Sequence, residues 1–195
     1  MKILIVTPLY PPDIASHAPY VKDLAFRLQS SHTVSILTYN FIPEKIEGVT
    51  IHTIQKRLST PIRIFKFTKL LFALAKENDL LYIQNGPSVE LPLMLVSLLN
   101  KIPYFVRDGD PQASSFAQSH SWYKNLHSFV KRNAKGIVCH TEKQNGLFVL
   151  TNKAEGLLKP EIIPYEEKPL QAIAQYEENW YAHLLELDEL FNTTI

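Results

Sequence analysis

Residues 1–20, MKILIVTPLYPPDIASHAPY, decide how the rest of the chain is organised. The apolar run from Lys2 to Thr7 is short and rich in β-branched residues, which is typical of a strand buried on both faces. The prolines that follow stop both strand and helix, and a helix begins near Pro19. A strand, a loop and a helix in this order form the first unit of a doubly wound α/β sheet, in which ligands bind at the carboxyl ends of the strands. A site is therefore expected first at residues 9–18.

The composition fits one globular domain with at most a small appendage. The chain has 195 residues, 46% of them hydrophobic, and a formal net charge of +1, so its overall charge does not indicate a nucleic-acid partner. Its one cysteine, Cys139, excludes an internal disulfide framework and favours a reducing, cytoplasmic location. The sequence shows no signal peptide and no stretch of transmembrane length, in agreement with that location.

Short apolar runs alternate with amphipathic stretches along most of the chain. Further strands are expected at 33–38, 49–54, 80–84, 103–107, 136–140 and 161–164. Helices are expected at 19–29, 61–78 (capped by Thr60), 88–100 and 122–133, with a short one after 142. This alternation predicts an α/β fold with a single Rossmann-like doubly wound, mostly parallel sheet and helices on both faces.

The end of the chain carries a helical stripe, in which apolar side chains recur at spacings of three and four. The stripe comprises Ile173, Tyr176, Trp180, Leu184, Leu187 and Phe191. It predicts an amphipathic helix over 171–195 that packs back on the domain. The expected organisation is therefore a domain over 1–164, a connector over 165–170 and this final helix.

The usual cofactor and nucleotide motifs are absent from the sequence. It has no glycine-rich dinucleotide or phosphate loop, no nucleophile elbow and no metal-spaced Cys/His cluster, so no cofactor and no metal are expected. The site is instead expected where the carboxyl ends of the parallel strands share one edge. The candidate residues at this edge are Pro12, Asp13, Ser16, His17, Gln84, Asn85, Gly86, Arg107, Asp108, Gly109, Asp110, His140 and Glu142.

Three of these residues are candidates for catalysis. Asp108 and Asp110 act as a base or hold a sugar hydroxyl in one interpretation, and with Pro111 they form only a turn in the other. His17 is either a general base or an inert loop histidine. Arg107 has the chemistry to pair with a phosphate.

The helix expected at 61–78 carries cations on what its spacing predicts to be one face. These are Arg63, Lys66, Lys69 and Lys76, and no acidic residue lies between Lys56 and Lys76. One interpretation is a solvated helix surface. The other is a face that contacts anionic lipid at the inner side of a membrane, or an anionic acceptor.

Several stretches together resemble the amino-terminal domain of family-4-type GT-B glycosyltransferases. The first is MKILIVTPLYPPDIASHAPYVKDLAFRL, followed by TVSILT and GVTIHTI. Later ones are IQNGPSVELPLMLVSLLNKIPYFVRDGDP, GIVCHTEKQ and EIIP, so the resemblance covers residues 1–164. The stretch EENWYAHLLELDELF looks like the helix that crosses back onto this domain in that family.

The resemblance implies transfer of a sugar from a nucleotide-sugar co-substrate to an acceptor. The amino-terminal domain of the family mainly holds the acceptor, and a second domain holds the donor. Only a short connector stands in that second domain's place here, so the chain is expected to be an acceptor-binding half that needs a donor-binding subunit or a second copy, because transfer requires both substrates in one cleft. Residues 15–17, Ala-Ser-His, stand where the family usually has two glycines, which disfavours donor binding by this loop.

Two other interpretations stay open. One is a non-catalytic module that binds a sugar- or lipid-linked acceptor, or an anionic membrane. The other is an inactive deletion form of a full-length glycosyltransferase.

Overall fold

The fold is built on one sheet whose strands stand in the order β3-β2-β1-β4-β5-β6-β7-β8. The computed structural model describes residues 1–13, 17–140, 148–151, 156–157 and 169–192. The strands are β1 (Lys2–Thr7), β2 (Thr33–Tyr39), β3 (Thr50–Ile54), β4 (Leu80–Gln84), β5 (Tyr104–Asp108), β6 (Gly136–His140), β7 (Phe148–Thr151) and β8 (Gly156–Leu157). Neighbours from β3 to β6 pair in parallel, and β7 and β8 continue the sheet antiparallel.

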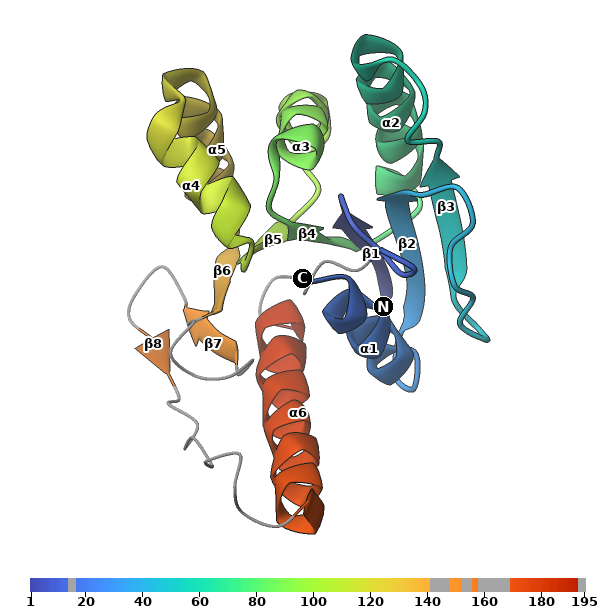
Figure 1. The fold of residues 1–195 in the computed structure, drawn as a ribbon, viewed down its shortest axis with the longest axis vertical. Coiled ribbons are helices and arrows are strands. Elements are labelled where there is room, and N and C mark those ends of the chain that lie inside the picture. Colours follow the sequence, from blue (N-terminus) through green and yellow to red (C-terminus); the bar gives the residue numbers. More distant parts are fainter. Residues whose placement is uncertain (14–16, 141–147, 152–155, 158–168, 193–195) are drawn as a thin grey trace.

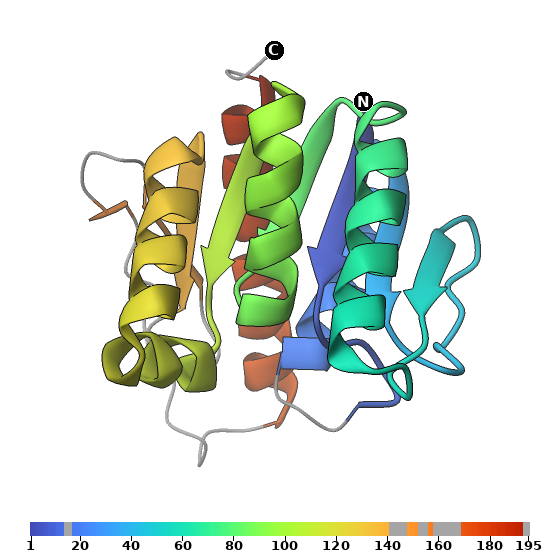
Figure 2. The ribbon, with the colours of Figure 1, turned by 90° about the horizontal axis from the view of Figure 1, so that it is seen from above.

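Helices cover both faces of the sheet, which confirms the predicted α/β fold (Figure 1). They are α1 (His17–Leu28), α2 (Thr60–Ala75), α3 (Pro87–Leu99), α4 (Pro111–Ser119), α5 (Ser121–Asn133) and α6 (Pro169–Asn192). The helices α2, α3, α4 and α5 lie on one face, and α1 and α6 lie on the other. Figure 2 shows α2, α3 and α5 side by side in front of the strands.

The central strand β1 shows why this chain forms a sandwich of three layers. Its residues from Ile3 to Val6 are fully buried. Because side chains alternate along a strand, Leu4 and Val6 pack into the core under α2–α5, whereas Ile3 and Ile5 pack into the core under α1 and α6. An unbroken apolar run is therefore required here, and a half-polar strand would leave one layer without a core.

Three local predictions differ from the structure, and a fourth is not tested. Helix α4 lies in a segment that the sequence left without an element, and the hairpin β7–β8 stands where only a short helix was expected. The N-cap of α2 is Ser59 rather than Thr60, and its side chain makes no capping hydrogen bond. The strand expected at 161–164 lies outside the described residues.

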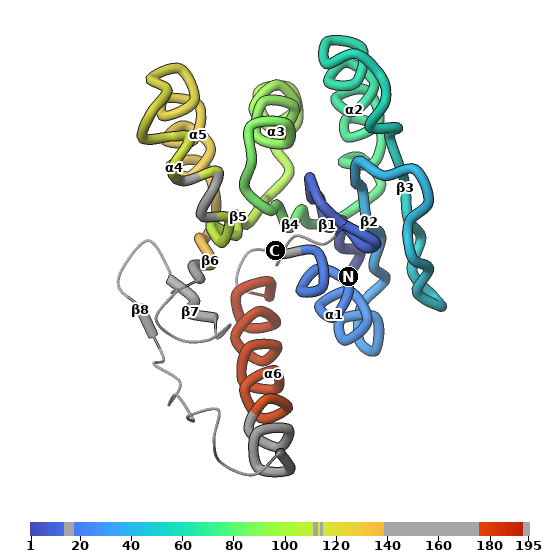
Figure 3. The backbone as a smooth tube through the Cα atoms, in the orientation of Figure 1, coloured from blue at the N-terminus to red at the C-terminus, as the bar shows by residue number. Residues whose placement is uncertain are grey.

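The final helix α6 packs along α1, as the tube in Figure 3 shows, and confirms the predicted C-terminal helix. Trp180, Leu187 and Phe191 are buried, but Tyr176, also expected on the packing stripe, is 47% exposed. Arg27 of α1 donates two hydrogen bonds of 2.8 Å to the carboxylate of Glu177. In the described part of the chain, no helix is both long and apolar enough to cross a membrane.

Candidate functional site

The candidate site lies at the carboxyl edge of the sheet, where the strand order reverses. Strand β1 pairs with β2 on one side and with β4 on the other, and ligands of doubly wound folds bind outside such a switch point. Thr7, Gln84 and Asp108 end the three strands β1, β4 and β5. The predicted convergence of residues that are distant in sequence therefore holds for these three strand ends.

A buried polar layer joins these strands on the side of α1 and α6. Thr7 Oγ1 donates a hydrogen bond of 2.7 Å to Gln84 Oε1. Gln84 is the register neighbour of Arg107 on β5, and both side chains are at most 2% exposed. Gln84 Nε2 has no hydrogen-bond partner among the described residues. An unsatisfied donor at this depth is costly unless something else accepts its hydrogen bond.

Arg107 lies on a cluster of aromatic groups inside this layer. Its guanidinium carbon is 3.7 Å from the centre of the Tyr20 ring. The Tyr20 hydroxyl is 2.8 Å from that of Tyr82 and 3.1 Å from His183 Nε2. Burial, together with the charge of Arg107, lowers the pKa of His183 to about 3, so this imidazole is neutral at physiological pH.

Gly109, which follows β5, leaves space for the Arg107 side chain because it has no Cβ atom. A Cβ atom built on Gly109 would lie 2.9 Å from the guanidinium carbon of Arg107, closer than van der Waals contact. The guanidinium is therefore held between the Tyr20 ring and the backbone of the loop that leaves β5. This places a cation directly under the edge where a ligand is expected.

On the other side of β5, Asn85 fastens the loop that contains both candidate aspartates. Its Nδ2 donates a hydrogen bond of 2.9 Å to Asp108 Oδ1. Its Oδ1 accepts from the backbone N–H groups of Gly109 and Asp110, at 3.3 and 3.0 Å. Asn85 therefore fixes the loop that leaves β5, and Pro111 starts α4 directly after it.

Asp108 is also tied to the helix α5 by two cations. Lys131 Nζ lies 2.5 Å from Asp108 Oδ2, and His127 Nε2 lies 3.8 Å from the same oxygen. Burial acts to raise the pKa of Asp108, but His127 and Lys131 outweigh it and hold this pKa well below the usual range. Asp108 is therefore an ionised acceptor of hydrogen bonds at neutral pH, and a poor general base.

Glu90 and His127 complete this network, and neither was among the residues predicted from the sequence. Glu90 of α3 is fully buried, and its Oε1 accepts from His127 Nδ1 at 2.9 Å and from the Gly86 N–H at 3.3 Å. Gly86 has a φ of 149°, a conformation that favours glycine. A signal for Glu90 was present, because it is the one charged residue in the apolar stretch 88–100.

We expect the free energy of unfolding to fall as the pH rises from about 6.5 to about 9. Although burial alone would lower it, Asp108 and Glu90 raise the pKa of His127 from 6.5 to about 9. A raised folded-state pKa gives stability that is complete below the unfolded value and is lost through the folded one. The loss is about 1–3 kcal/mol, after allowing for partial solvent access.

Urea denaturation at pH values on both sides of this range measures the effect. His127→Gln, which does not titrate, is the matched control and should show a flatter curve over the same pH range. Asp108 contributes with the opposite sign, because its lowered pKa gives stability that is lost only in acid. A wild-type curve that is flat or rising between pH 6.5 and 9 would contradict the assignment of His127.

The remaining residues predicted at this edge lie outside the network around Asp108, or outside the described residues. Asp13 accepts hydrogen bonds from Lys56 Nζ at 2.5 Å and from the Tyr10 N–H at 3.2 Å, so it anchors the first loop, next to the exposed Pro12. His17 is the first residue of α1 and His140 is the last of β6. Ser16 and Glu142 lie outside the described residues.

The four cations expected on one face of α2 do not all share it. Lys66, Lys69 and Lys76 are exposed. Arg63 is half-buried: its Nη1 donates to the Lys56 carbonyl at 3.2 Å, and its guanidinium lies 5.4 Å from the Tyr39 ring centre. The expectation is therefore wrong for Arg63, which binds within the domain.

Among the described residues, no group of three or more His, Cys, Asp or Glu side chains is placed to hold a metal ion.

Comparisons with known proteins support the fold. No family model and no curated protein matches the sequence. The DNA/pantothenate metabolism flavoprotein from Streptococcus pneumoniae has a similar structure, with 13% identity, 98% of this chain and 99% of that chain covered, and a TM-score of 0.54. The C-terminal domain of the coenzyme A biosynthesis bifunctional protein CoaBC gives 11% identity, 96% of each chain and a TM-score of 0.50.

A third structure, UDP-GlcNAc 2-epimerase from Neisseria meningitidis bound to UDP-GlcNAc, matches over a smaller part. It gives 14% identity, 73% of this chain, 41% of that chain and a TM-score of 0.45. At these identities the likeness concerns the Rossmann-like fold alone.

Proposed function

We propose that this chain binds a sugar- or lipid-linked acceptor at the carboxyl edge of its sheet and serves as the acceptor-side half of a glycosyltransferase. The observation that carries the proposal is the position of Gln84, Arg107 and Asp108 at the carboxyl ends of β4 and β5, next to the switch point between β1 and β4. At the end of β5, the buried guanidinium of Arg107 and the ionised carboxylate of Asp108 therefore lie on opposite sides of the strand. A nucleotide sugar would enter as co-substrate on a donor-binding partner chain or on a second copy.

The geometry suggests separate roles for the two aspartates. Asp108 is ionised and held by Asn85 and Lys131, so it suits the positioning of a sugar hydroxyl better than proton abstraction. Asp110, whose backbone is fixed by Asn85, is the better candidate for a general base in this loop. Hydroxyl groups fixed by charged acceptors gain both affinity and orientation, which is what an acceptor site requires.

An NMR titration of the ¹⁵N-labelled chain tests the proposal. Saccharide and lipid-linked acceptors should shift the amides at 84–86 and 107–110, whereas free nucleotide diphosphates and nucleotide sugars should bind weakly. Asp110→Asn should abolish sugar transfer in the presence of a donor-binding partner, while Glu178→Gln, an exposed change on α6, should not. Tight binding of a nucleotide sugar by the chain alone, or no response of this edge to any acceptor, would overturn it.

A specific observation favours a second candidate function, contact with an anionic membrane through α2. Ile62 is 50% exposed and Phe65 is 70% exposed, close to the exposed lysines 66 and 69 on this helix, which has no acidic residue. Apolar side chains beside cations are typical of helices that lie in a membrane interface. Lys66→Glu with Lys69→Glu should weaken binding to anionic vesicles, and unchanged binding would count against this candidate.

A further inference from the structure

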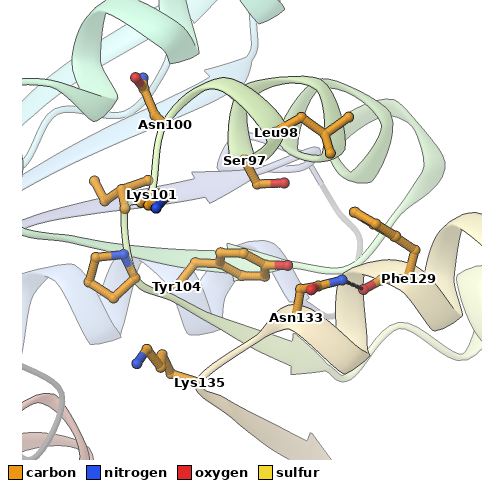
Figure 4. Close-up of a pocket in the computed structure, with 10 residues that line it drawn as sticks. Ser97, Leu98, Asn100, Lys101, Tyr104, Phe129, Asn133 and Lys135 are labelled. Atoms are coloured by element: carbon orange, nitrogen blue, oxygen red, sulfur yellow. Dashed lines mark hydrogen bonds between the residues drawn. The ribbon is translucent and has the colours of Figure 1, made fainter.

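A hollow of about 570 Å³ lies at the edge of the sheet opposite the candidate site, between the ends of α3 and α5. Its two ends differ in chemistry (Figure 4). Lys101 and Lys135 lie at one end, Leu98 and Phe129 lie at the other, and the Tyr104 ring lies between them. The described lining contains no acidic residue. A ligand that fits would therefore carry an anionic group and an apolar part.

Within the described part of the chain, the side chains of the two lysines donate no hydrogen bond to the helix ends beside them. Cations are attracted to the carboxyl ends of helices, but two carbonyls near the end of α5 already accept hydrogen bonds from other side chains. Tyr104 Oη donates to the Val130 carbonyl at 2.9 Å, and Asn133 Nδ2 donates to the Phe129 carbonyl at 2.8 Å. Neither ammonium group has a hydrogen-bond or ion-pair partner within the described part of the chain. Both charges are therefore available to a ligand.

The surface of α3 next to the hollow exposes three large apolar side chains. On α3, Leu98 is 66% exposed, Leu99 is 74% exposed and Leu95 is 42% exposed. Contiguous apolar surface of this kind marks interaction sites. Because cations stand beside it, the surface suits the interface of an anionic bilayer better than an uncharged one.

We propose that this hollow binds the phosphate headgroup of an anionic phospholipid, with Lys101 and Lys135 on the phosphate and with Leu98 and Leu99 in the acyl layer. The ammonium groups offer charge-assisted hydrogen bonds to phosphate oxygens. Leu98 lines the hollow and is exposed, so one lipid molecule contacts both the cations and the apolar rim. The site is independent of the edge at which acceptor binding is proposed.

Co-sedimentation with vesicles tests the proposal. The full chain should bind vesicles of phosphatidylglycerol and phosphatidylcholine, and should bind pure phosphatidylcholine far more weakly. Lys101→Gln with Lys135→Gln should reduce binding to the anionic vesicles on the order of tenfold, since each lysine near such a surface contributes measurably. Lys45→Gln with Lys124→Gln removes the same charge from exposed positions elsewhere and should change binding by no more than about twofold.

A second measurement separates the headgroup from the bilayer. In NMR titrations, short-chain phosphatidylglycerol should shift the amides of Lys101, Tyr104 and Lys135, and glycerol phosphate should shift them weakly. Equal binding of glycerol phosphate would replace the lipid by a free phosphate ester and overturn the membrane assignment. Anionic vesicles that bind the Lys101/Lys135 variant as tightly as the wild-type chain would overturn the site. Neither result bears on residues 84–86 and 107–110, whose response tests the proposed acceptor site.

Discussion

Asp108→Ala is expected to lower the free energy of unfolding by about 3 kcal/mol. The substitution removes the acceptor of Lys131 and of the Asn85 amide, and one of the two carboxylates beside His127. Removing one partner of a buried ion pair commonly costs 3–5 kcal/mol because the remaining charge stays buried. The Asp108 side chain is 15% exposed, so the lower end of this range applies.

Urea denaturation near neutral pH measures this loss, and a titration of the His127 ring by NMR reports its cause. In the variant, Glu90 alone raises the pKa of His127, so this pKa should fall clearly below its wild-type value of about 9. Asp108→Asn keeps a hydrogen-bond acceptor without the charge and should lie between the wild-type chain and Asp108→Ala in stability. Glu178→Ala, exposed on α6, is the control and should change stability by less than about 0.5 kcal/mol.

An unchanged His127 pKa in Asp108→Ala would show that the two groups do not interact in solution. A loss of stability with an unchanged pKa would assign the whole effect to Lys131 and Asn85. The two readouts together therefore separate the electrostatic part of the network from its hydrogen bonds.

The centre of the sheet could be predicted from the sequence because the buried parallel strands β1, β4 and β5 are short, mostly apolar runs that are each followed by a helix. The run Leu80–Gln84 shows this pattern, and all five of its residues are buried. Helix α4 was missed because the segment from Pro111 to Ser119 is polar and rich in serine, which favours caps and turns over helix interiors. A start signal was nevertheless present, since Asp110 followed by Pro111 is a typical N-cap with proline in the first turn.

Only those residues of the candidate site that lie at strand ends could be predicted from the sequence. The strand ends carry Gln84, Arg107 and Asp108, and parallel topology alone brings them to one edge. Their partners His127, Lys131 and His183 come from helices in which nothing in the spacing indicates a site. Whether an aspartate is a base or a fixed carboxylate depends on those partners, so Asp108 could not be assigned before the packing of α5 was known.

Phe191→Ala is expected to cost about 3–5 kcal/mol of unfolding free energy, the usual loss for a large aromatic residue in a core. Phe191 is fully buried. Its ring centre lies 5.4 Å from that of Phe105 on β5 and 6.4 Å from that of Tyr82 on β4. The cavity left by the substitution would open between α6 and the sheet, where neighbouring aromatic rings cannot easily collapse into it.

The matched control is Tyr181→Ala on the same helix, because Tyr181 is 66% exposed and its loss should change stability by less than about 0.5 kcal/mol. Hydrogen exchange of the α6 amides distinguishes loosening of this helix from global destabilisation. If α6 opens alone, its amides should lose protection in Phe191→Ala while those of β1 keep theirs.

Since Tyr82 also hydrogen-bonds Tyr20, whose ring contacts Arg107, loss of α6 packing should also disturb the buried polar layer at the candidate site. Equal stability of Phe191→Ala and Tyr181→Ala would mean that α6 does not pack on β4 and β5 in solution.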